Sequence, residues 1–327
     1  MKSIFALLSC ATAALAASRT SAPSGCITVG SGSSFSTIQA ALNSLSTTAS
    51  GKQCIFIKSG TYKEQVLVSA RSAQLTIYGS TTDTTSYAAN SVTITGSKSQ
   101  ADGLGNDETA TLRVKAVNFK LYNVNVANTY GKGSQALALS AFADSGYYGN
   151  SFKGFQDTVL AQSGKQLYAH NHIEGATDFV FGQNSPAWFE KNDIRVVTNS
   201  IGYISANGRS SSSGISQFVF NNCDVAAASG NTVKSGTYYL GRPWGEYARV
   251  TFQKTSMSEV INPAGWHPWN TGDERTEHVT FAEYGNTGPG ASGTRAKFST
   301  KPSSPVAISA VLGSNYASLG FYDADYM

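Results

Sequence analysis

Charged side chains are scarce in this sequence. Asp, Glu, Lys and Arg together make up 13% of the 327 residues, about half of the ~25% that is usual in soluble globular proteins. The net charge is a mild +4, and no cluster of Lys and Arg marks a surface for nucleic acid. We therefore expect no nucleic-acid partner, and the charge by itself specifies no other.

Long apolar runs are missing after the N-terminus. The one run, residues 4–15, follows Lys2 and leads into small residues that fit a signal-peptidase site after Ala16 or Ala17. It is shorter than the roughly 20 residues that span a bilayer. The pattern predicts a signal peptide over residues 1–17 and a secreted mature protein, residues 18–327, that forms one domain without a membrane anchor.

Cysteine is also rare. Of four cysteines, Cys10 would leave with the signal peptide, so that Cys26, Cys54 and Cys223 remain. An odd number in an oxidising compartment permits one disulfide and one free thiol. Cys26 and Cys54 lie close together and precede the strand-rich body, which favours a Cys26–Cys54 disulfide and a buried thiol at Cys223.

The sequence does not support a serine esterase site or a metal-dependent hydrolytic site. The Gly-x-Ser-x-Gly signature of many serine esterases is absent. His170 and His172 could suggest a metal pair, but histidines two apart on a strand commonly flank a turn, and no third ligand is evident. We expect neither a metal nor another cofactor.

Short strand-sized segments dominate what is present. Runs such as residues 54–60 (CIFIKSG) and 74–80 (QLTIYGS) are rich in β-branched and aromatic residues and end in small turn residues. The best helix candidate is residues 35–42, with apolar side chains at 35, 38 and 42. The sequence predicts an all-β protein with one short N-terminal helix that caps an end of the fold.

One pattern recurs along the chain: a large apolar residue, a polar or small residue three positions later, and a second apolar residue two positions after that. Its first residues are separated by 21, 21, 31 and 32 positions, and they are Tyr147, Tyr168, Phe189, Phe220 and Phe252. A period near 20 with longer insertions is typical of a solenoid whose loops vary on one side. In a parallel β-helix, Asn150, Asn171 and Asn192 would stack on successive coils. Chance recurrence in an antiparallel sandwich is the alternative.

The same spacing relates two pairs of polar residues. Gln135 and Gln156 are 21 residues apart, and so are Asp157 and Asp178. In a solenoid each pair would stack, although Gln156 and Asp157 need a bend or bulge to reach one cleft. Two carboxylates one coil apart cannot both ionise without cost, so one is pushed toward its protonated form while the other, if an arginine supports it, stays ionised. That split suits acid and nucleophile roles, and amides can bind an oxyanion. The alternative for each aspartate is a turn cap or a surface group.

Six segments resemble the signature motifs of the pectin methylesterase family, in the family's order: residues 135–137 (QAL), 154–158 (GFQDT), 175–182 (GATDFVFG), 240–244 (LGRPW), 264–266 (AGW) and 282–291 (AEYGNTGPGA). The short region ahead of them is more like that of fungal than of plant members. The resemblance implies a single-stranded right-handed parallel β-helix that hydrolyses the C6 methyl esters of homogalacturonan and releases methanol. We expect a secreted monomer that acts on pectin.

The resemblance also implies a role for each site residue. Asp178 would attack the ester carbonyl, and Asp157 would protonate the departing methanol and then activate water. Gln135 and Gln156 would bind the oxyanion, and Arg242 would hold Asp178 ionised. Substrate-binding residues would include the aromatic side chains of Phe181, Trp244 and Trp266; Trp269 is a further candidate.

One departure from the family pattern concerns substrate preference. Plant and bacterial members of the family usually carry an aromatic residue after a Gln-Asp-Thr-Leu segment, whereas in this chain Gln-Asp-Thr is followed by Val159-Leu160-Ala161. Two other functions stay open on sequence grounds: a pectin lyase or hydrolase of the same fold, and a non-catalytic pectin-binding solenoid. The first would need more clustered acidic residues, and the second would have no use for the Gln and Asp pairs.

Overall fold

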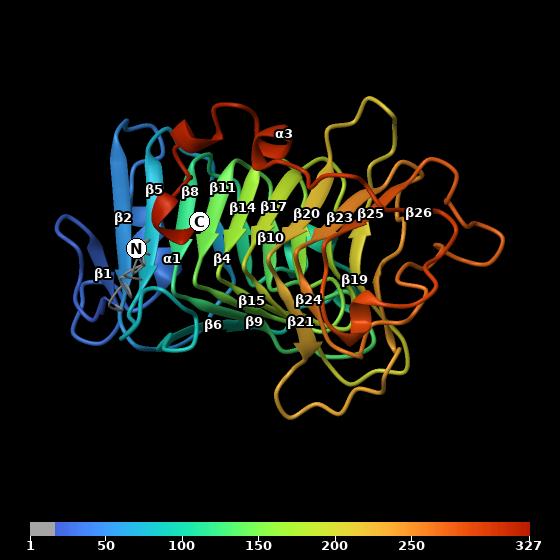
Figure 1. The fold of residues 1–327 in the computed structure, drawn as a ribbon. Helices are drawn as coiled ribbons and strands as arrows, with labels where there is room; N and C mark the ends of the chain where they lie inside the picture. Colours follow the sequence, from blue (N-terminus) through green and yellow to red (C-terminus); the bar gives the residue numbers. More distant parts are fainter. Residues whose placement is uncertain (1–16) are drawn as a thin grey trace, which may run out of the picture.

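The computed structural model describes residues 17–327, so the expected signal peptide, residues 1–17, lies outside the described residues except for Ala17. The chain winds into successive coils, each of which contributes strands to stacked parallel sheets (Figure 1). This is the predicted right-handed parallel β-helix. The pairing is parallel between all named strands, and the core fills the space that the three sheets enclose.

We number the sheets I to III. Sheet I contains eleven strands, β1 (Ile27–Val29), β2 (Lys52–Ile57), β5 (Gln74–Gly79), β8 (Phe119–Tyr122), β11 (Ser145–Tyr148), β14 (Gln166–Ala169), β17 (Pro186–Glu190), β20 (Gln217–Asn221), β23 (Arg249–Gln253), β25 (Thr280–Tyr284) and β26 (Ser299–Thr300). Sheet II contains eight, β3 (Gly60–Lys63), β6 (Val92–Gly96), β9 (Asn125–Asn128), β12 (Ser151–Lys153), β15 (His172–Gly175), β18 (Asp193–Val196), β21 (Asp224–Ala227) and β24 (Ser256–Met257). Sheet III contains seven, β4 (Val66–Val68), β7 (Leu112–Val114), β10 (Leu139–Ala141), β13 (Val159–Ala161), β16 (Thr177–Gly182), β19 (Gly202–Asn207) and β22 (Tyr238–Gly241).

The helices are short and lie outside the sheets. They are α1 (Ile38–Ser44), α2 (Asn106–Thr109) and α3 (Ile308–Leu312), with 3-10 turns at Gln100–Asp102, Pro289–Ala291, Tyr316–Ser318 and Ala324–Tyr326. Helix α1 begins within the predicted span of residues 35–42 and packs against β1, β2 and β4 at the N-terminal end. Thr37 caps it, because its Oγ1 accepts from Ala40 N at 3.2 Å.

A column of aromatic rings runs through the interior. It consists of the five residues that open the sequence repeat, and successive ring centroids are 4.7, 4.6, 4.5 and 4.2 Å apart, from Tyr147 through Tyr168, Phe189 and Phe220 to Phe252. All five rings are completely buried. Parallel strands stand about 4.8 Å apart, so equivalent side chains on successive coils meet face to face. The sequence period is therefore the coil period.

The predicted asparagine column forms a hydrogen-bonded ladder. Asn171 Oδ1 accepts from the backbone N of Asn150 at 2.8 Å, and Asn192 Oδ1 accepts from the backbone N of Asn171 at the same distance. The residue before each rung has a left-handed backbone, with φ of 61° at Gly149, 56° at His170 and 50° at Lys191. This turn redirects the chain from sheet I to sheet II, and the buried amides satisfy its backbone groups.

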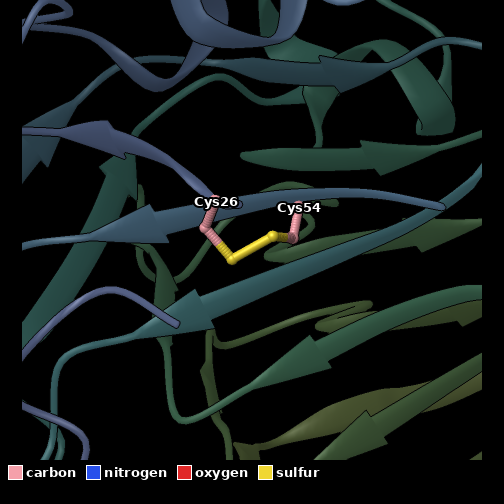
Figure 2. The surroundings of a disulfide bond; sticks show 2 residues. All are labelled: Cys26 and Cys54. Atoms are coloured by element: carbon pink, nitrogen blue, oxygen red, sulfur yellow. A yellow bond between two sulfur atoms is a disulfide. The ribbon is translucent and has the colours of Figure 1, made fainter. Parts of the chain in front are cut away.

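A disulfide joins Cys26 to Cys54 across the first two coils, with the Cα atoms 4.7 Å apart (Figure 2). Cys26 immediately precedes β1, and Cys54 lies in β2, so the bond ties the outermost strand of sheet I to its neighbour. Cys223 is a free, buried thiol that takes the next position of the asparagine ladder. Its Sγ lies 3.5 Å from the carbonyl oxygen of Phe189.

The C-terminal segment returns across the outer face of sheet I, and the chain ends beside the early coils (Figure 1). Gln253 holds it at one end by accepting from Val306 N at 2.8 Å and donating to Val306 O at 3.0 Å. Tyr122 donates to Asp323 Oδ2 at 2.6 Å near the other end. Within residues 17–327, no helix has the length and apolar character needed to cross a membrane.

We expect Asn171→Ala to destabilise the fold by about 3 kcal/mol or more, since it leaves several buried groups unpaired and each costs about 1–3 kcal/mol. Those groups include the backbone N of Asn150 and the carbonyl oxygen of Tyr147. Chemical denaturation measures the change. Asn43→Ala on the exposed face of α1 is the control and should stay within about 0.5 kcal/mol of wild type; equal effects would contradict the role of the ladder.

Candidate active site

Two adjacent coils bring Asp157 and Asp178 to equivalent positions. Gln156 pairs with Thr177, and Val159 pairs with Val180, so the 21-residue offset holds on both sides of the aspartates. The backbone N of Asp157 donates to Thr177 O at 3.0 Å. Both aspartates lie where the chain passes from sheet II into sheet III, and their side chains belong to one cavity on the outside of sheet III.

A left-handed backbone at both aspartates supplies the bend that the sequence required. Asp157 has φ of 64° and Asp178 has φ of 49°, a conformation that costs a non-glycine residue roughly 1–3 kcal/mol. Between Thr177 and Val180, β16 also has one residue more than β19, which is a β-bulge. Local strain is thus concentrated at the two carboxylates, as is common where side chains are aimed at a substrate.

The cavity has a volume of about 230 Å³. It is lined by Asn106, Gln135, Gln156, Asp157, Asp178, Phe181, Ala206, Arg242, Trp244 and Trp269. The structure therefore brings together all five residues that the sequence predicted for catalysis and two of the three predicted for substrate binding. These seven residues come from four coils, and residues as far apart as Gln135 and Trp244 meet only because the coils stack.

Arg242 binds one of the two aspartates and not the other. Its Nε donates to Asp178 Oδ1 at 2.8 Å, and its Nη2 donates to Asp178 Oδ2 at 2.6 Å. Such a two-point fork fixes the plane of the carboxylate and favours its ionised form. Burial raises the pKa of Asp178, and the hydrogen bonds and charge of Arg242 oppose that rise.

Asp157 has no such partner among the described residues. Its side chain is as buried as that of Asp178, with the two residues 7% and 6% exposed. Burial raises the pKa of Asp157 well above its usual value, and the charge of Asp178 raises it further, while Arg242 opposes both. The pair is therefore unequal: Asp178 loses its proton first, and Asp157 retains one.

The two glutamines line the same cavity as the carboxylates. The backbone N of Ala136 donates to Gln156 O at 3.2 Å, which stacks the coil of Gln135 on that of Gln156. Within residues 17–327, neither side-chain amide forms a hydrogen bond, although both line the cavity. Their N–H groups are free to donate to a ligand.

An apolar floor lies beside these polar groups. It consists of buried Ala110, Leu137, Leu160, Phe181 and Ala206, with Trp244 packed against them. The rings of Phe181 and Trp244 are 6.0 Å apart and tilted by 53°. Leu160, in the segment where the sequence departs from the expected family pattern, is part of this floor and pairs with Phe181 on the next strand. An aliphatic side chain thus fills this position.

The position of Trp266 contradicts the prediction that this residue binds substrate. Its indole is 1% exposed and belongs to the interior, where it stacks on Phe281 with ring centroids 4.4 Å apart. Its Nε1 donates to buried Glu283 at 3.3 Å, and Arg295 pairs with the same carboxylate at 2.8 Å. Trp266 stabilises the last coils, and three residues further on, Trp269 lines the cavity instead.

Two aromatic rings that the sequence did not single out for this purpose hold Arg242. Its guanidinium lies 4.1 Å from the ring centroid of Tyr203 and 4.4 Å from that of Trp269. Cation–π contacts of this kind stabilise a charge while leaving its N–H groups free. Asn106, at the start of α2, is also new; its Oδ1 accepts from Gln100 Nε2 at 2.6 Å. No motif marked Tyr203 or Asn106.

A short hairpin places Trp269. The backbone N of Trp269 donates to Glu274 O at 3.0 Å, and Asn270 pairs with Asp273. Arg275 closes the hairpin: it donates to Trp244 O, binds Asp273 Oδ2 at 2.6 Å, and lies 5.1 Å from the ring of Trp269. Arg275 thus connects both cavity tryptophans without lining the cavity itself.

We expect Arg275→Ala to lower kcat/KM for the ester substrate that the sequence predicts by roughly tenfold, the effect of losing one charged hydrogen bond. The cause would be looser placement of Trp269 against Arg242. Steady-state kinetics measure it, and Arg275→Lys should recover part of the loss. Thermal unfolding provides the control, because a lowered Tm with unchanged kcat/KM would assign Arg275 to stability alone.

The fold and the cavity together define a hydrolase built on a parallel β-helix, and comparisons with known proteins agree. A family model described as pectinesterase matches residues 26–316. Pectinesterases of Aspergillus niger and Aspergillus aculeatus are each 54% identical to the chain; the alignments cover 97% of this chain, and 97% and 98% of theirs. The solved structure of the pectin methylesterase from Aspergillus niger has a TM-score of 0.88 at 41% identity, covering 94% of this chain and all of that one.

The chain therefore belongs to the pectinesterase family and is a carboxylic ester hydrolase with pectin methylesterase function. The fungal origin of these relatives confirms the predicted resemblance to fungal members.

Proposed function

We propose that the protein hydrolyses the C6 methyl esters of homogalacturonan through a covalent ester intermediate on Asp178. The observation that carries this assignment is the fork between Arg242 and Asp178, which favours a charged, oriented carboxylate at one position only. An ionised carboxylate is a nucleophile, whereas a protonated one is an acid. The unequal environments of Asp178 and Asp157 therefore assign the two roles.

The first step forms an acyl-enzyme and releases methanol. Asp178 Oδ attacks the C6 carbonyl carbon, and the carbonyl electrons move to its oxygen. The side-chain amides of Gln135 and Gln156 donate to this oxyanion, where charge develops in the transition state. The intermediate collapses, the C6–O bond to the methoxy group breaks, and Asp157 gives its proton to the departing oxygen.

The second step restores the enzyme. Asp157, now a carboxylate, takes a proton from water, and the resulting hydroxide attacks the C6 carbonyl of the acyl-enzyme. The bond to Asp178 breaks, and both aspartates return to their starting states. The product leaves as the galacturonic acid, which loses its proton to solvent and becomes the carboxylate. Every proton comes from a side chain or from water, so the cycle needs no cofactor and no metal.

The apolar floor suits the polymer that carries the ester. Phe181 and Trp244 line the cavity together with the carboxylates, and aromatic rings bind the C–H surfaces of pyranose rings. The methylated polymer is uncharged at each ester, so its binding relies on shape and apolar contact rather than on cations. We infer that methyl-esterified pectin is the partner, as the names of the relatives imply for those proteins.

The proposal extends to where the enzyme acts. A signal peptide over residues 1–17 would direct secretion, and residues 18–327 would act outside the cell as a single-domain monomer. The Cys26–Cys54 disulfide supports this location, because such bonds persist in oxidising compartments.

The two aspartate variants separate the steps. With a substrate that carries a better leaving group than methanol, Asp157→Asn should release one equivalent of alcohol rapidly and then turn over slowly, because only water activation has lost its base. Asp178→Asn should show no burst, since an amide does not attack the ester. Stopped-flow measurement of alcohol release tests this. A burst from Asp178→Asn and none from Asp157→Asn would reverse the assignment.

The glutamines should affect turnover more than binding. Gln156→Ala or Gln135→Ala should lower kcat by about 10²–10³-fold, the usual effect of removing one oxyanion donor. Affinity for de-esterified pectin should hardly change, because the donors act on charge that exists only in the transition state. Gln217→Ala, on sheet I, is the matched control. A change confined to KM would show that the amides hold substrate instead.

A further inference from the structure

A loop arches over the outer face of sheet II, away from the active site. It comprises residues 80–91, between β5 and β6. Asn90 Nδ2 donates to Asn125 Oδ1 at 3.3 Å and to Gly149 O at 2.9 Å, and Tyr87 Oη donates to Asp193 Oδ2. Asn125 and Asp193 begin β9 and β18, three strands apart, so the arch spans about 14 Å of the sheet.

Beneath the arch lies a cleft of about 350 Å³. It is lined by Tyr87, Ala88, Asn90, Thr93, Asn125, Val126, Ala127, Ser151, Lys153 and His172. It shares no lining residue with the cavity that contains Asp157 and Asp178. Its volume falls at the lower end of the range for small-ligand sites, roughly 300–1,000 Å³, which accommodates one or two sugar rings.

Two buried polar atoms in this cleft have no partner among residues 17–327. Ser151 is 3% exposed, and its Oγ forms no hydrogen bond; the Oδ1 of Asn90 is also buried and unpaired. Ser151 stands on β12 between Asn125 and His172, its neighbours on the adjacent strands. A buried hydroxyl without a partner costs about 1–3 kcal/mol, so the site favours a ligand that offers hydroxyl groups.

The cleft also contains a positively charged side chain, Lys153, whose ion pair is long. The side chain of Lys153 is 52% exposed, and its Nζ is 3.7 Å from Glu174 Oε2, whereas His172 Nε2 is 3.0 Å from the same oxygen. Carboxylates do not line the cleft. Three carboxylates of sheet II lie around it and already have partners: Glu174 contacts His172 and Lys153, and Asp193 and Asp224 bind Arg195 at 3.0 and 2.8 Å. Lys153 is thus available to an anion.

We propose that this cleft binds a uronic-acid unit of an acidic polysaccharide. Sugar hydroxyls pair with Ser151 and Asn90, the ring of Tyr87 forms one wall, and Lys153 meets the carboxylate. De-esterified galacturonan, the product of the enzyme's own reaction, has this chemistry, as have other polyuronates. A second contact on sheet II holds the enzyme to the polymer while the active site on sheet III is free, and avidity follows from the linkage between the two sites.

Isothermal titration with trigalacturonate tests the proposal on the intact protein. Wild type should bind two molecules, one at the active site and one at the cleft. Lys153→Ala should weaken the second site by at least about tenfold, the loss expected for one charged hydrogen bond. Ser151→Ala should weaken it severalfold without lowering Tm, because the free protein loses only an unpaired hydroxyl. Lys297→Ala, which removes the same charge from an exposed position, should leave both sites unchanged.

Kinetics separate this site from catalysis. Lys153→Ala should retain wild-type kcat and KM on methyl-esterified trigalacturonate, so the two proposals fail independently. Binding of trigalacturonate but not of a short alginate identifies a galacturonan site, and binding of both identifies a general uronate site. A single binding site in wild type, equal binding of a neutral galactan oligomer, or an equal loss in Lys297→Ala would overturn the proposal and leave a cleft that holds water only.

Discussion

The register between adjacent coils is the constraint on which the whole molecule depends. The same 21-residue offset stacks Tyr147 on Tyr168 and Asn150 on Asn171, and it places Asp157 beside Asp178. The interior stacks fix this register, because a slip of one residue would turn each buried ring and amide outward. The carboxylates on the outside are therefore positioned by the aromatic and asparagine columns on the inside. The geometry of the proposed catalytic site therefore follows from how the interior packs.

Asymmetry within the aspartate pair then comes from outside the coil repeat. Stacking alone makes Asp157 and Asp178 equivalent, and two equal carboxylates would share one proton without a preferred site. Arg242, which follows β22, lies two coils beyond Asp178 and binds it alone. Tyr203 and Trp269 form cation–π contacts with the guanidinium, and Arg275 anchors the hairpin that carries Trp269. In the proposed mechanism, this ion pair and its aromatic supports therefore distinguish the nucleophile from the acid.

The features that depend on the sequence repeat could be predicted from the sequence. The spacing of Tyr147, Tyr168 and Phe189 predicted the solenoid, and the same interval located Gln156 and Asp178. Motifs added Arg242 and Trp244, which directly follow β22, where the coils are longer than 21 residues. Trp266 and Trp269 could not be distinguished by sequence, because the exposure of each tryptophan depends on how the final coils pack and on the ion pair of Glu283 with Arg295.

Tyr203 belongs to no motif, and its contact with Arg242 exists only once the strands are stacked. The arch of residues 80–91 was equally hidden, since its partners lie up to 106 residues away.

The central claim is that Asp178 is ionised while Asp157 carries a proton, and a titration of the two carboxyl groups tests it most directly. Carbon-13 NMR of the Asp side chains would follow both signals with pH, with Asp157→Asn and Asp178→Asn supplying the assignments. The account predicts that the Asp178 signal titrates at lower pH than that of Asp157, and that Arg242→Ala narrows the gap between them. An Asp157 signal that titrates first, or two signals unaffected by the loss of Arg242, would contradict it.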